Sequence, residues 1–167
     1  MYEIHVMVNY DWIKVPMIKK ADAISVNWDN TILTYNDNFK SYDYAYSDLQ
    51  GKWITYKTWN APEALNQGGL GIYTYIDYTY RLPSGEMNGA GGLKGTVTFS
   101  LTPEPRFSMS IAPGNNSTTI NCKYVHDKNP LLGSLSFSYE GFSVSIDTGA
   151  LQDSIADEAR IDYTRIA

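Results

Sequence analysis

Apolar and polar residues alternate with a period of two along most of the chain, and turn-forming residues interrupt the alternation at short intervals. The stretch YEIHVMVN, for example, places Tyr2, Ile4, Val6 and Val8 on one face of an extended strand. Further stretches follow the same pattern: GTVTFSL, RFSMSIA, TINCKYV, SLSFSYE and FSVSIDT. Glu140-Gly141 separates the last two and predicts a tight hairpin turn. This pattern is typical of an all-β protein.

The run GIYTYIDYTY at residues 71–80 concentrates tyrosines in a segment that also alternates. One face carries Ile72, Thr74, Ile76, Tyr78 and Tyr80, and the other carries Tyr73, Tyr75, Asp77 and Thr79. The first face has more apolar residues, which favours it as the core face of a central strand. Tyr73 and Tyr75 then point to the opposite face, where they stack on neighbouring strands or contact a ligand.

Several segments lack this alternation, and we expect turns, loops or short helices there. Tyr10-Asp11 predicts a hairpin turn into a second strand, WIKVPMI, in which Pro16 requires an edge position or a bulge. Residues 36–48 are polar and aromatic without a hydrophobic period, and GAGGLKG is rich in glycine, so both predict loops. Pro62 predicts the start of a single helical turn, and LQDSIADEA predicts one short helix.

The number and spacing of the alternating segments favour an antiparallel fold with many short strands. No repeat of fixed period and no linker divides the chain. We therefore expect a single domain over residues 1–167. Its predicted fold is an all-β, antiparallel β-sandwich or flattened barrel with at most short helical turns.

Composition adds a strong aromatic bias to this prediction. Aromatic residues make up 14% of the sequence, with 14 tyrosines and four tryptophans. Such residues favour both pleated sheets and recognition surfaces. The formal net charge is −5 and the basic residues are scattered, which argues against a nucleic acid partner.

The N-terminal segment contains Glu3 and no apolar run of the length of a signal peptide. No stretch approaches about 18 consecutive apolar residues, the length that predicts a transmembrane helix. Cys122 is the only cysteine, so the chain cannot form an internal disulfide. We expect a cytoplasmic protein, or one released by a non-classical route.

The sequence contains little that points to catalysis or metal binding. His126 adjoins Asp127, but neighbouring residues on a strand face opposite ways and make no dyad. The sequence contains no G-x-S-x-G motif, and its oxygen-bearing side chains lack the spacing of a calcium-binding loop. We predict no catalytic residue, no metal and no cofactor. Asp77 keeps one enzymatic alternative open, a glycosidase that pairs it with Glu86, Glu140 or Asp147.

Aromatic residues near the predicted loops form the candidate binding site. Trp53 and Trp59 share a face of the stretch KWITYKTW with Thr55 and Lys57. Tyrosine and tryptophan rings stack on the apolar faces of sugars and also sit at the depth of lipid head groups. The predicted ligand-binding residues are Tyr42, Asp43, Tyr44, Tyr46, Trp53, Trp59, Asn60, Tyr73 and Tyr75, with Asp43 and Asn60 as hydrogen-bonding groups.

Residues 91–125, GGLKGTVTFSLTPEPRFSMSIAPGNNSTTINCKYV, resemble the centre of the aegerolysin and actinoporin-like β-sandwich proteins. The positions that match in character are Gly92, Gly95, Val97, Phe99, Leu101, Phe107, Met109, Ile111, Pro113, Gly114 and Asn115. The tryptophan-rich head-group cluster of aegerolysins and the N-terminal helix of actinoporins have no counterpart here. The resemblance implies a compact sandwich that recognises a lipid or glycan, as a component of a cytolysin or toxin system.

Two functional hypotheses follow from these observations. The first is a non-enzymatic recognition domain that binds a glycan or a membrane lipid head group through exposed tyrosine and tryptophan side chains. The alternative is a structural, self-assembling subunit whose aromatic face contacts a protein partner or a second copy in a homo-oligomer.

Overall fold

A computed structural model describes residues 2–12, 21–47, 50–75, 79–81, 87–110, 116–127, 135–148 and 152–166. All regular secondary structure in this part of the chain is β-strand, as the alternation predicts. The strands are β1 (Ile4–Trp12), β2 (Ala21–Asn27), β3 (Leu33–Tyr35), β4 (Lys40–Ser47), β5 (Lys52–Trp59), β6 (Ala64–Asn66), β7 (Gly69–Tyr75), β8 (Thr79–Arg81), β9 (Met87–Pro103), β10 (Phe107–Met109), β11 (Asn116–Asp127), β12 (Ser136–Glu140), β13 (Ser143–Asp147) and β14 (Gln152–Arg165).

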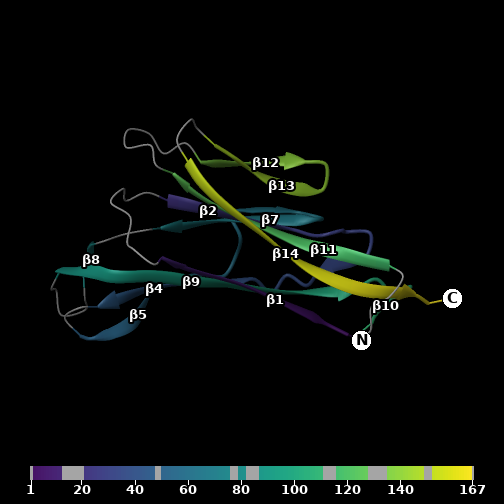
Figure 1. The fold of residues 1–167 in the computed structure, drawn as a ribbon, viewed down its shortest axis with the longest axis horizontal. Coiled ribbons are helices and arrows are strands. Elements are labelled where there is room, and N and C mark those ends of the chain that lie inside the picture. The colour runs from purple at the N-terminus through teal and green to yellow at the C-terminus, as the bar shows by residue number, and fades with distance from the viewer. Residues whose placement is uncertain are drawn as a thin grey trace.

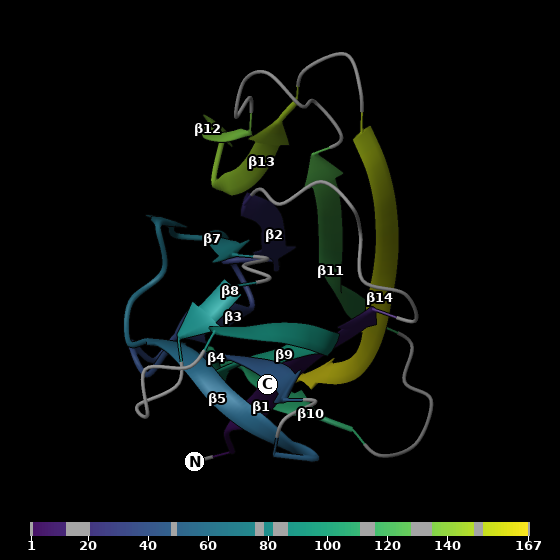
Figure 2. The same ribbon diagram turned by 90° about the vertical axis from the view of Figure 1, so that its left-hand side faces the viewer.

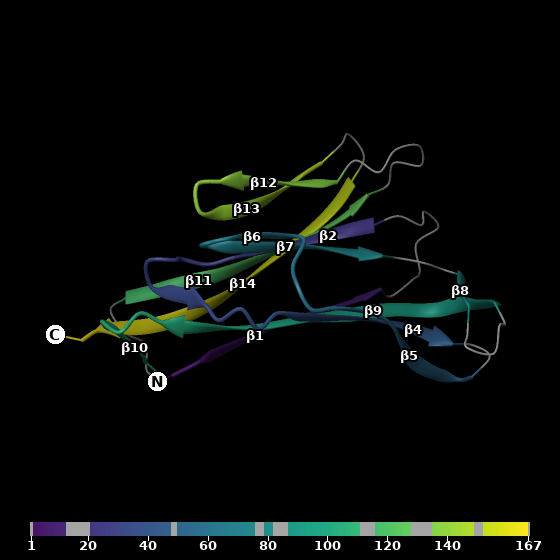
Figure 3. The ribbon, with the colours of Figure 1, turned by 180° about the vertical axis from the view of Figure 1, so that it is seen from behind.

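The strands form two larger sheets and one hairpin, which lie in layers (Figures 1 and 3). The first sheet, called the β9 sheet, has the order β1-β9-β4-β5, and β3 and β8 also pair with β9. The second, called the β11 sheet, has the order β10-β14-β11-β2-β7-β6. The β12–β13 hairpin lies on the far side of the β11 sheet, and all pairings are antiparallel (Figure 3). The prediction of an all-β sandwich is confirmed.

The main core lies between the two sheets. The alternating positions Val97 and Leu101 of β9 are buried there against Ile24 of β2 and Ile72 of β7. Full burial of one such side chain stabilises the fold by roughly 1.5–3 kcal/mol. Ile4, Val6 and Val8 of β1 pack against the edge of this core, as predicted, whereas Tyr2 precedes β1 and is 74% exposed.

The β12–β13 hairpin covers the second face of β7. Its two-residue turn has Gly141 at a φ of 61°, which favours glycine, and this turn confirms the sequence prediction. Gly71 leaves the space for the Phe137 ring, because a Cβ atom at this position would lie 2.5 Å from that ring. Tyr73 packs on Phe137 with ring centroids 4.8 Å apart and donates a hydrogen bond to the Leu135 carbonyl at 3.1 Å.

The prediction of a loop at residues 36–48 holds for residues 36–39 but is wrong for Lys40–Ser47, which is strand β4 in the interior of the β9 sheet. The buried residues of β4 are small or polar, as Ser41 and Ala45 illustrate, so no face of the strand is marked by large apolar residues in the sequence. Its side chains alternate with a period of two nevertheless, and the tyrosines occupy the other face.

The predicted loop GAGGLKG and the predicted turn at Tyr10-Asp11 are wrong for a related reason. The glycine-rich segment belongs to β9, and β1 continues through Tyr10 and Asp11 to Trp12. Tyr10 lies opposite Gly95, where an added Cβ atom would approach the Tyr10 hydroxyl to 2.1 Å. Glycine therefore makes room for an aromatic ring inside a strand here. The predicted strand WIKVPMI lies mostly outside the described residues.

Neither of the two predicted helical segments is a helix. The helical turn expected to begin at Pro62 is absent: Pro62 and Glu63 are irregular, and Ala64–Asn66 form β6, which pairs with β7. The helix expected in LQDSIADEA belongs to β14, which pairs with β11 residue by residue from Asp127↔Gln152 to Asn116↔Tyr163. β14 curves along one side of the molecule towards β10 (Figure 2). Pairing with a long neighbour decides the conformation of this segment, whose own residues are mostly polar.

Candidate functional site

The outer face of β4 carries tyrosines at every second position. Tyr42, Tyr44 and Tyr46 are half-buried and alternate with side chains that point into the molecule. β4 and β5 lie on the side of the molecule away from the β12–β13 hairpin (Figure 3). The three tyrosines are therefore presented at the surface of the β9 sheet.

A β-bulge in β5 decides which tryptophan joins this surface. The pairing with β4 shifts at Tyr56, where β5 contains one extra residue. On one side of the bulge Trp53 lies opposite Tyr46 on the outer face, and on the other side Trp59 lies opposite Ser41 on the core face. Trp53 is 38% exposed, whereas Trp59 packs against the core. The expectation that both tryptophans share a face is wrong, because the bulge breaks the alternation.

The aromatic rings of this surface contact one another in pairs. Tyr42 and Tyr44 stack with ring centroids 6.4 Å apart and an interplanar angle of 20°. Tyr46 and Trp53 meet edge to face with centroids 5.6 Å apart. Such contacts fix the orientation of each ring and leave part of its surface open to a partner.

Trp53 is also held by β9. The Lys94 ammonium lies 4.2 Å from the centre of the Trp53 ring, a favourable cation–π geometry. Beneath the ring, an added Cβ atom at Gly92 would lie 3.0 Å from Trp53 Cη2, which is closer than ordinary contact. The absent side chain of Gly92 therefore allows the indole to lie close to the sheet.

Polar side chains surround the rings because neighbouring strands pair in register. Lys94 of β9 lies between Asp11 of β1 and Tyr44 of β4, and Tyr44 in turn lies opposite Thr55. The next row contains Asn9, Thr96, Tyr42 and Thr58. Directly opposite residues share a face of the sheet. We call this surface the tyrosine face, and it consists of Asn9, Asp11, Tyr42, Tyr44, Tyr46, Trp53, Thr55, Thr58, Lys94 and Thr96.

Two predicted members of the site lie on the opposite side of the sheet. Asp43 is 2% exposed and accepts a hydrogen bond from the Tyr10 hydroxyl within the sandwich. Trp59 also faces inward, with the Lys57 ammonium 4.8 Å from its ring centre. Asn60 directly follows β5 and is exposed. The structure thus separates Asp43 and Trp59 from the tyrosines that surround them in the sequence.

The residues predicted from the GIYTYIDYTY run have different surroundings. Ile72 and Thr74 are buried on the core face, as predicted, and Tyr73 is half-buried under the β12–β13 hairpin. The side chain of Tyr75 and all of Asp77 lie outside the described part of the chain, so their predicted roles remain predictions. The tyrosine of β7 that the structure describes therefore belongs to a packed layer.

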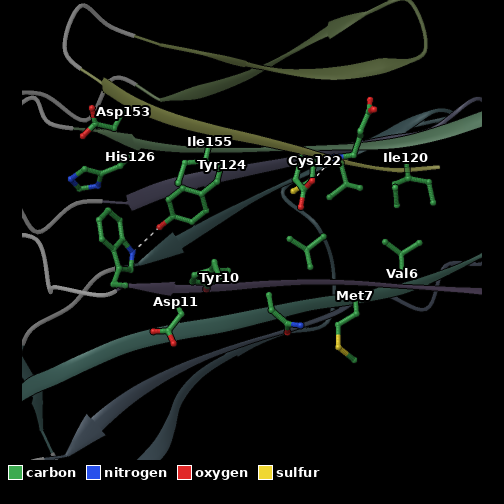
Figure 4. A pocket seen from close by; sticks show the side chains of 17 residues that line it. Val6, Met7, Tyr10, Asp11, Ile120, Cys122, Tyr124, His126, Asp153 and Ile155 are labelled. Carbon is green, nitrogen blue, oxygen red and sulfur yellow. Dashed lines mark hydrogen bonds between the residues drawn. The ribbon is translucent and has the colours of Figure 1, made fainter.

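A groove of about 680 Å³ lies between β1 on one side and β11 and β14 on the other (Figure 4). Its wall includes the apolar side chains of Val6, Val8 and Ile120, and its mouth includes Asp153 and Asp157 of β14. Met7 and Asp11 also border it, but their side chains point away from it (Figure 4).

A buried polar network closes one end of the groove. His126 Nδ1 lies 2.7 Å from Asp22 Oδ1, and the Tyr124 hydroxyl donates a hydrogen bond to Asp22 Oδ2. The Trp12 indole NH donates to the Tyr124 oxygen at 3.0 Å, and the Trp12 ring meets the His126 ring at 4.9 Å. Asp22 is fully buried. The network therefore links β1, β2 and β11 through polar groups that satisfy one another.

Burial changes the protonation chemistry of this network. Burial raises the pKa of Asp22 to about 6, and the hydrogen bonds from Tyr124 and His126 oppose this rise. Burial and the neighbouring Asp22 carboxyl raise the pKa of the Tyr124 phenol. Burial, with a smaller effect of Asp157, raises the pKa of the Cys122 thiol to about 11. A thiol of this kind is a poor nucleophile at neutral pH.

Sequence reasoning missed the pairing of His126 with Asp22, because the two residues are far apart in the chain. The sequence neighbour of His126, Asp127, is itself buried, but the 2.7 Å contact is made with a residue of the adjacent strand β2. Val125 pairs with Ala23, which places His126 beside Asp22. Only the strand pairing could have revealed this contact.

Comparisons with known proteins do not assign the chain to a family. No family model, no curated protein and no solved structure matches it. The resemblance of residues 91–125 to aegerolysin and actinoporin-like proteins therefore stays a prediction. Within the described ranges, no helix has the length and apolarity to span a membrane, and no cluster of three or more His, Cys, Asp or Glu residues is arranged for a metal ion.

Proposed function

We propose that the protein is a non-enzymatic domain that binds a neutral glycan on the tyrosine face. The observation that carries the proposal is the alignment of Tyr42, Tyr44, Tyr46 and Trp53 on one outer surface of the β9 sheet. Aromatic rings pack on the apolar faces of sugar rings, and successive rings on one strand offer successive stacking positions.

The polar neighbours of the rings support a glycan ligand. Asp11, Asn9 and Lys94 supply an acceptor, an amide and a donor in the rows that contain Tyr42 and Tyr44. Thr55 and Thr58 add hydroxyl groups on the other side of these tyrosines. Sugar hydroxyls both donate and accept hydrogen bonds, so a mixed set of this kind suits them.

The charge of the surface favours a glycan over an anionic membrane. The tyrosine face contains one lysine, Lys94, and one aspartate, Asp11. Lys40 lies in the adjacent row on the same face of β4, and the whole chain has a net charge of −5. Binding to anionic lipid surfaces draws its strength from clusters of lysine and arginine, each worth about 1 kcal/mol. A membrane lipid head group is the alternative ligand, and a binding test must include it.

A glycan array followed by titration calorimetry tests the proposal. We expect a neutral oligosaccharide to bind, and Tyr44→Ala and Trp53→Ala each to weaken binding about tenfold, the equivalent of 1.4 kcal/mol. Tyr139→Ala is the matched control, because Tyr139 is 60% exposed on β12, away from this face. Circular dichroism verifies that each variant is folded.

Three outcomes would contradict the proposal. They are the absence of binding to any neutral glycan, an equal loss in the Tyr44 and Tyr139 variants, and binding only to phosphatidylcholine vesicles tested in parallel. The last outcome would assign the tyrosine face to a lipid head group instead.

A further inference from the structure

The groove between β1, β11 and β14 is bordered by apolar side chains from all three strands. Val6 and Val8 come from β1, Ile120 comes from β11, and Ile155 and Ala159 come from β14. Val6 and Ile120 point toward one another across the groove (Figure 4). The walls of the groove are therefore largely apolar.

The side chains of these walls are less buried than those of the core beside them. Val97 of β9 is fully buried, whereas Val8, which lies opposite it on β1, is half-buried. Ile155 lies opposite Tyr124 and shares its face of the β11 sheet, the face that packs on the main core, yet Ile155 is 73% exposed. The groove thus contains apolar surface that the described residues leave open to water. An apolar ligand would remove this surface from water, which is favourable.

The groove has the size of a small-molecule site and is closed at one end. Its volume of about 680 Å³ lies within the usual range of ligand pockets, about 300–1,000 Å³. The hydrogen bond from Trp12 to Tyr124 and the packing of Trp12 on His126 close one end. A polypeptide segment that crossed the groove would need both ends open, whereas a small molecule needs only the mouth beside Ile155. The shape therefore favours a small molecule.

Asp157 determines the charge that such a ligand should carry. It lies opposite Cys122, in the inner row of β14 between Ile155 and Ala159. Burial, and to a smaller extent the charge of Asp157, raises the pKa of the Cys122 thiol, so this carboxylate lies close to the groove wall. The groove lining contains no lysine or arginine among the described residues. A cationic ligand would therefore meet an opposite charge, and an anionic ligand a like charge.

We propose that the groove binds a hydrophobic amine, a molecule that joins one cationic nitrogen to an apolar chain. The chain lies between Val6, Ile120 and Ile155, and the ammonium group donates hydrogen bonds to the Asp157 carboxylate. Ile155 and Asp157 belong to the same row of β14, so one molecule that lies along this row contacts both. The site is separate from the tyrosine face, which lies on the outer surface of the β9 sheet, and it does not depend on the glycan proposal.

Titration calorimetry with octylamine, octanol and octanoate at neutral pH tests the proposal. The three probes have eight carbons each and differ in the charge of the head group. We expect octylamine to bind saturably and octanol to bind about fivefold more weakly, as for the loss of one partly exposed ion pair, with octanoate weaker still. Hexylamine should bind about tenfold more weakly than octylamine, because two fewer CH₂ groups enter the groove.

Protein variants separate the charged contact from the apolar contact. Asp157→Asn should weaken octylamine binding about fivefold and leave octanol binding unchanged, because it removes the charge and keeps the shape. Ile155→Asn should weaken binding of both probes about threefold, because both chains contact this side chain. The fold should tolerate both changes, since both residues are exposed. Glu63→Gln is the matched control, because it removes one exposed carboxylate beside β6, at the opposite edge of the β11 sheet from β14.

Cys122 reports the position of the bound amine. It lines the groove and is the only cysteine of the chain. Saturating octylamine should slow the alkylation of Cys122 by N-ethylmaleimide, and octanoate at the same concentration should not.

Other outcomes would overturn the inference. Octanoate that binds as tightly as octylamine, or equal losses in the Asp157 and Glu63 variants, would show that Asp157 does not select the ligand. Unchanged alkylation of Cys122 at saturation would place the amine outside the groove. Absence of octylamine binding at millimolar concentration would exclude an amine site.

Discussion

Two tyrosine-bearing strands of this protein, β4 and β7, have opposite relations to the surface. β7 buries Ile72 on one face and packs Tyr73 under the β12–β13 hairpin on the other. β4 buries small and polar residues on one face and presents Tyr42, Tyr44 and Tyr46 on the outer surface of the sheet. Tyr73, the tyrosine of the prominent sequence run whose side chain the structure describes, is thus part of a packed layer, and the less regular run carries the candidate site.

The difference shows that covering layers, more than residue type, determine what a tyrosine does. Tyr73 has Phe137 against its ring and gives its hydroxyl to a backbone carbonyl of the adjoining loop. The β4 tyrosines contact each other, Trp53 and the strands beside them. We therefore expect substitutions in the β11 sheet to alter stability and substitutions on the tyrosine face to alter binding.

The largest expected effect concerns the buried carboxyl beside β7. The folded state keeps the Asp22 proton at pH values where the unfolded chain has released it, because the pKa of Asp22 rises from 3.8 to about 6. The free energy of unfolding should therefore fall as pH rises from about 4 to 6, by about 3 kcal/mol. Urea titrations across this range measure it.

Asp22→Asn provides the matched test of this pH dependence. The variant is less stable overall, since Tyr124 and His126 lose a carboxylate partner. The decline between pH 4 and 6 should nevertheless be absent from it, while Tyr44→Ala keeps the wild-type profile. An identical decline in Asp22→Asn would show that another group causes it.

The second prediction compares one tyrosine from each strand. Tyr73→Ala should lower the free energy of unfolding by about 2 kcal/mol, because it leaves a space under the hairpin beside Phe137. Tyr44→Ala should lower it by less than about 1 kcal/mol, because one side of this ring faces solvent. Chemical denaturation of both variants gives the two values. Equal losses would contradict the distinction between a covered and an uncovered strand.

The smallest effect is expected at Gly92. Gly92→Ala should shift the Trp53 ring away from Lys94, since the added Cβ would lie 3.0 Å from Trp53 Cη2. We expect about threefold weaker binding of the oligosaccharide selected on the array, with little change in stability. Tryptophan fluorescence and titration calorimetry measure the two effects. Unchanged affinity would show that the position of Trp53 does not matter for the ligand.

The sequence was sufficient for the class of fold, because most strands have an apolar face. Ile4, Val6 and Val8 identify β1, and Ile72 and Thr74 identify the core face of β7. β4 was missed because its inner face carries Ser41 and Asp43 in place of aliphatic residues. A strand whose side chains alternate between the two faces, but which has no apolar face, leaves no hydrophobic pattern in the sequence.

The candidate site was predictable in its residue types but not in its arrangement. The tyrosines of β4 and Trp53 were identified, whereas Asp43 and Trp59 face the other way. Nothing in the sequence KWITYKTW marks the bulge at Tyr56 that separates the tryptophans. Lys94 and Asp11 were missed because they join the surface only through the pairing of β9 with β1 and β4, which a single sequence does not specify.

The central claim is that the uncovered tyrosines of β4 bind a glycan and the covered tyrosine of β7 does not. NMR spectra of the protein with ¹³C-labelled tyrosine rings, recorded during titration with the selected oligosaccharide, test it most directly. We predict that the ring signals of Tyr42, Tyr44 and Tyr46 shift together with one dissociation constant, while the Tyr73 signal stays in place. A shift of Tyr73 without shifts of the β4 tyrosines, or no shift at saturation, would contradict the account.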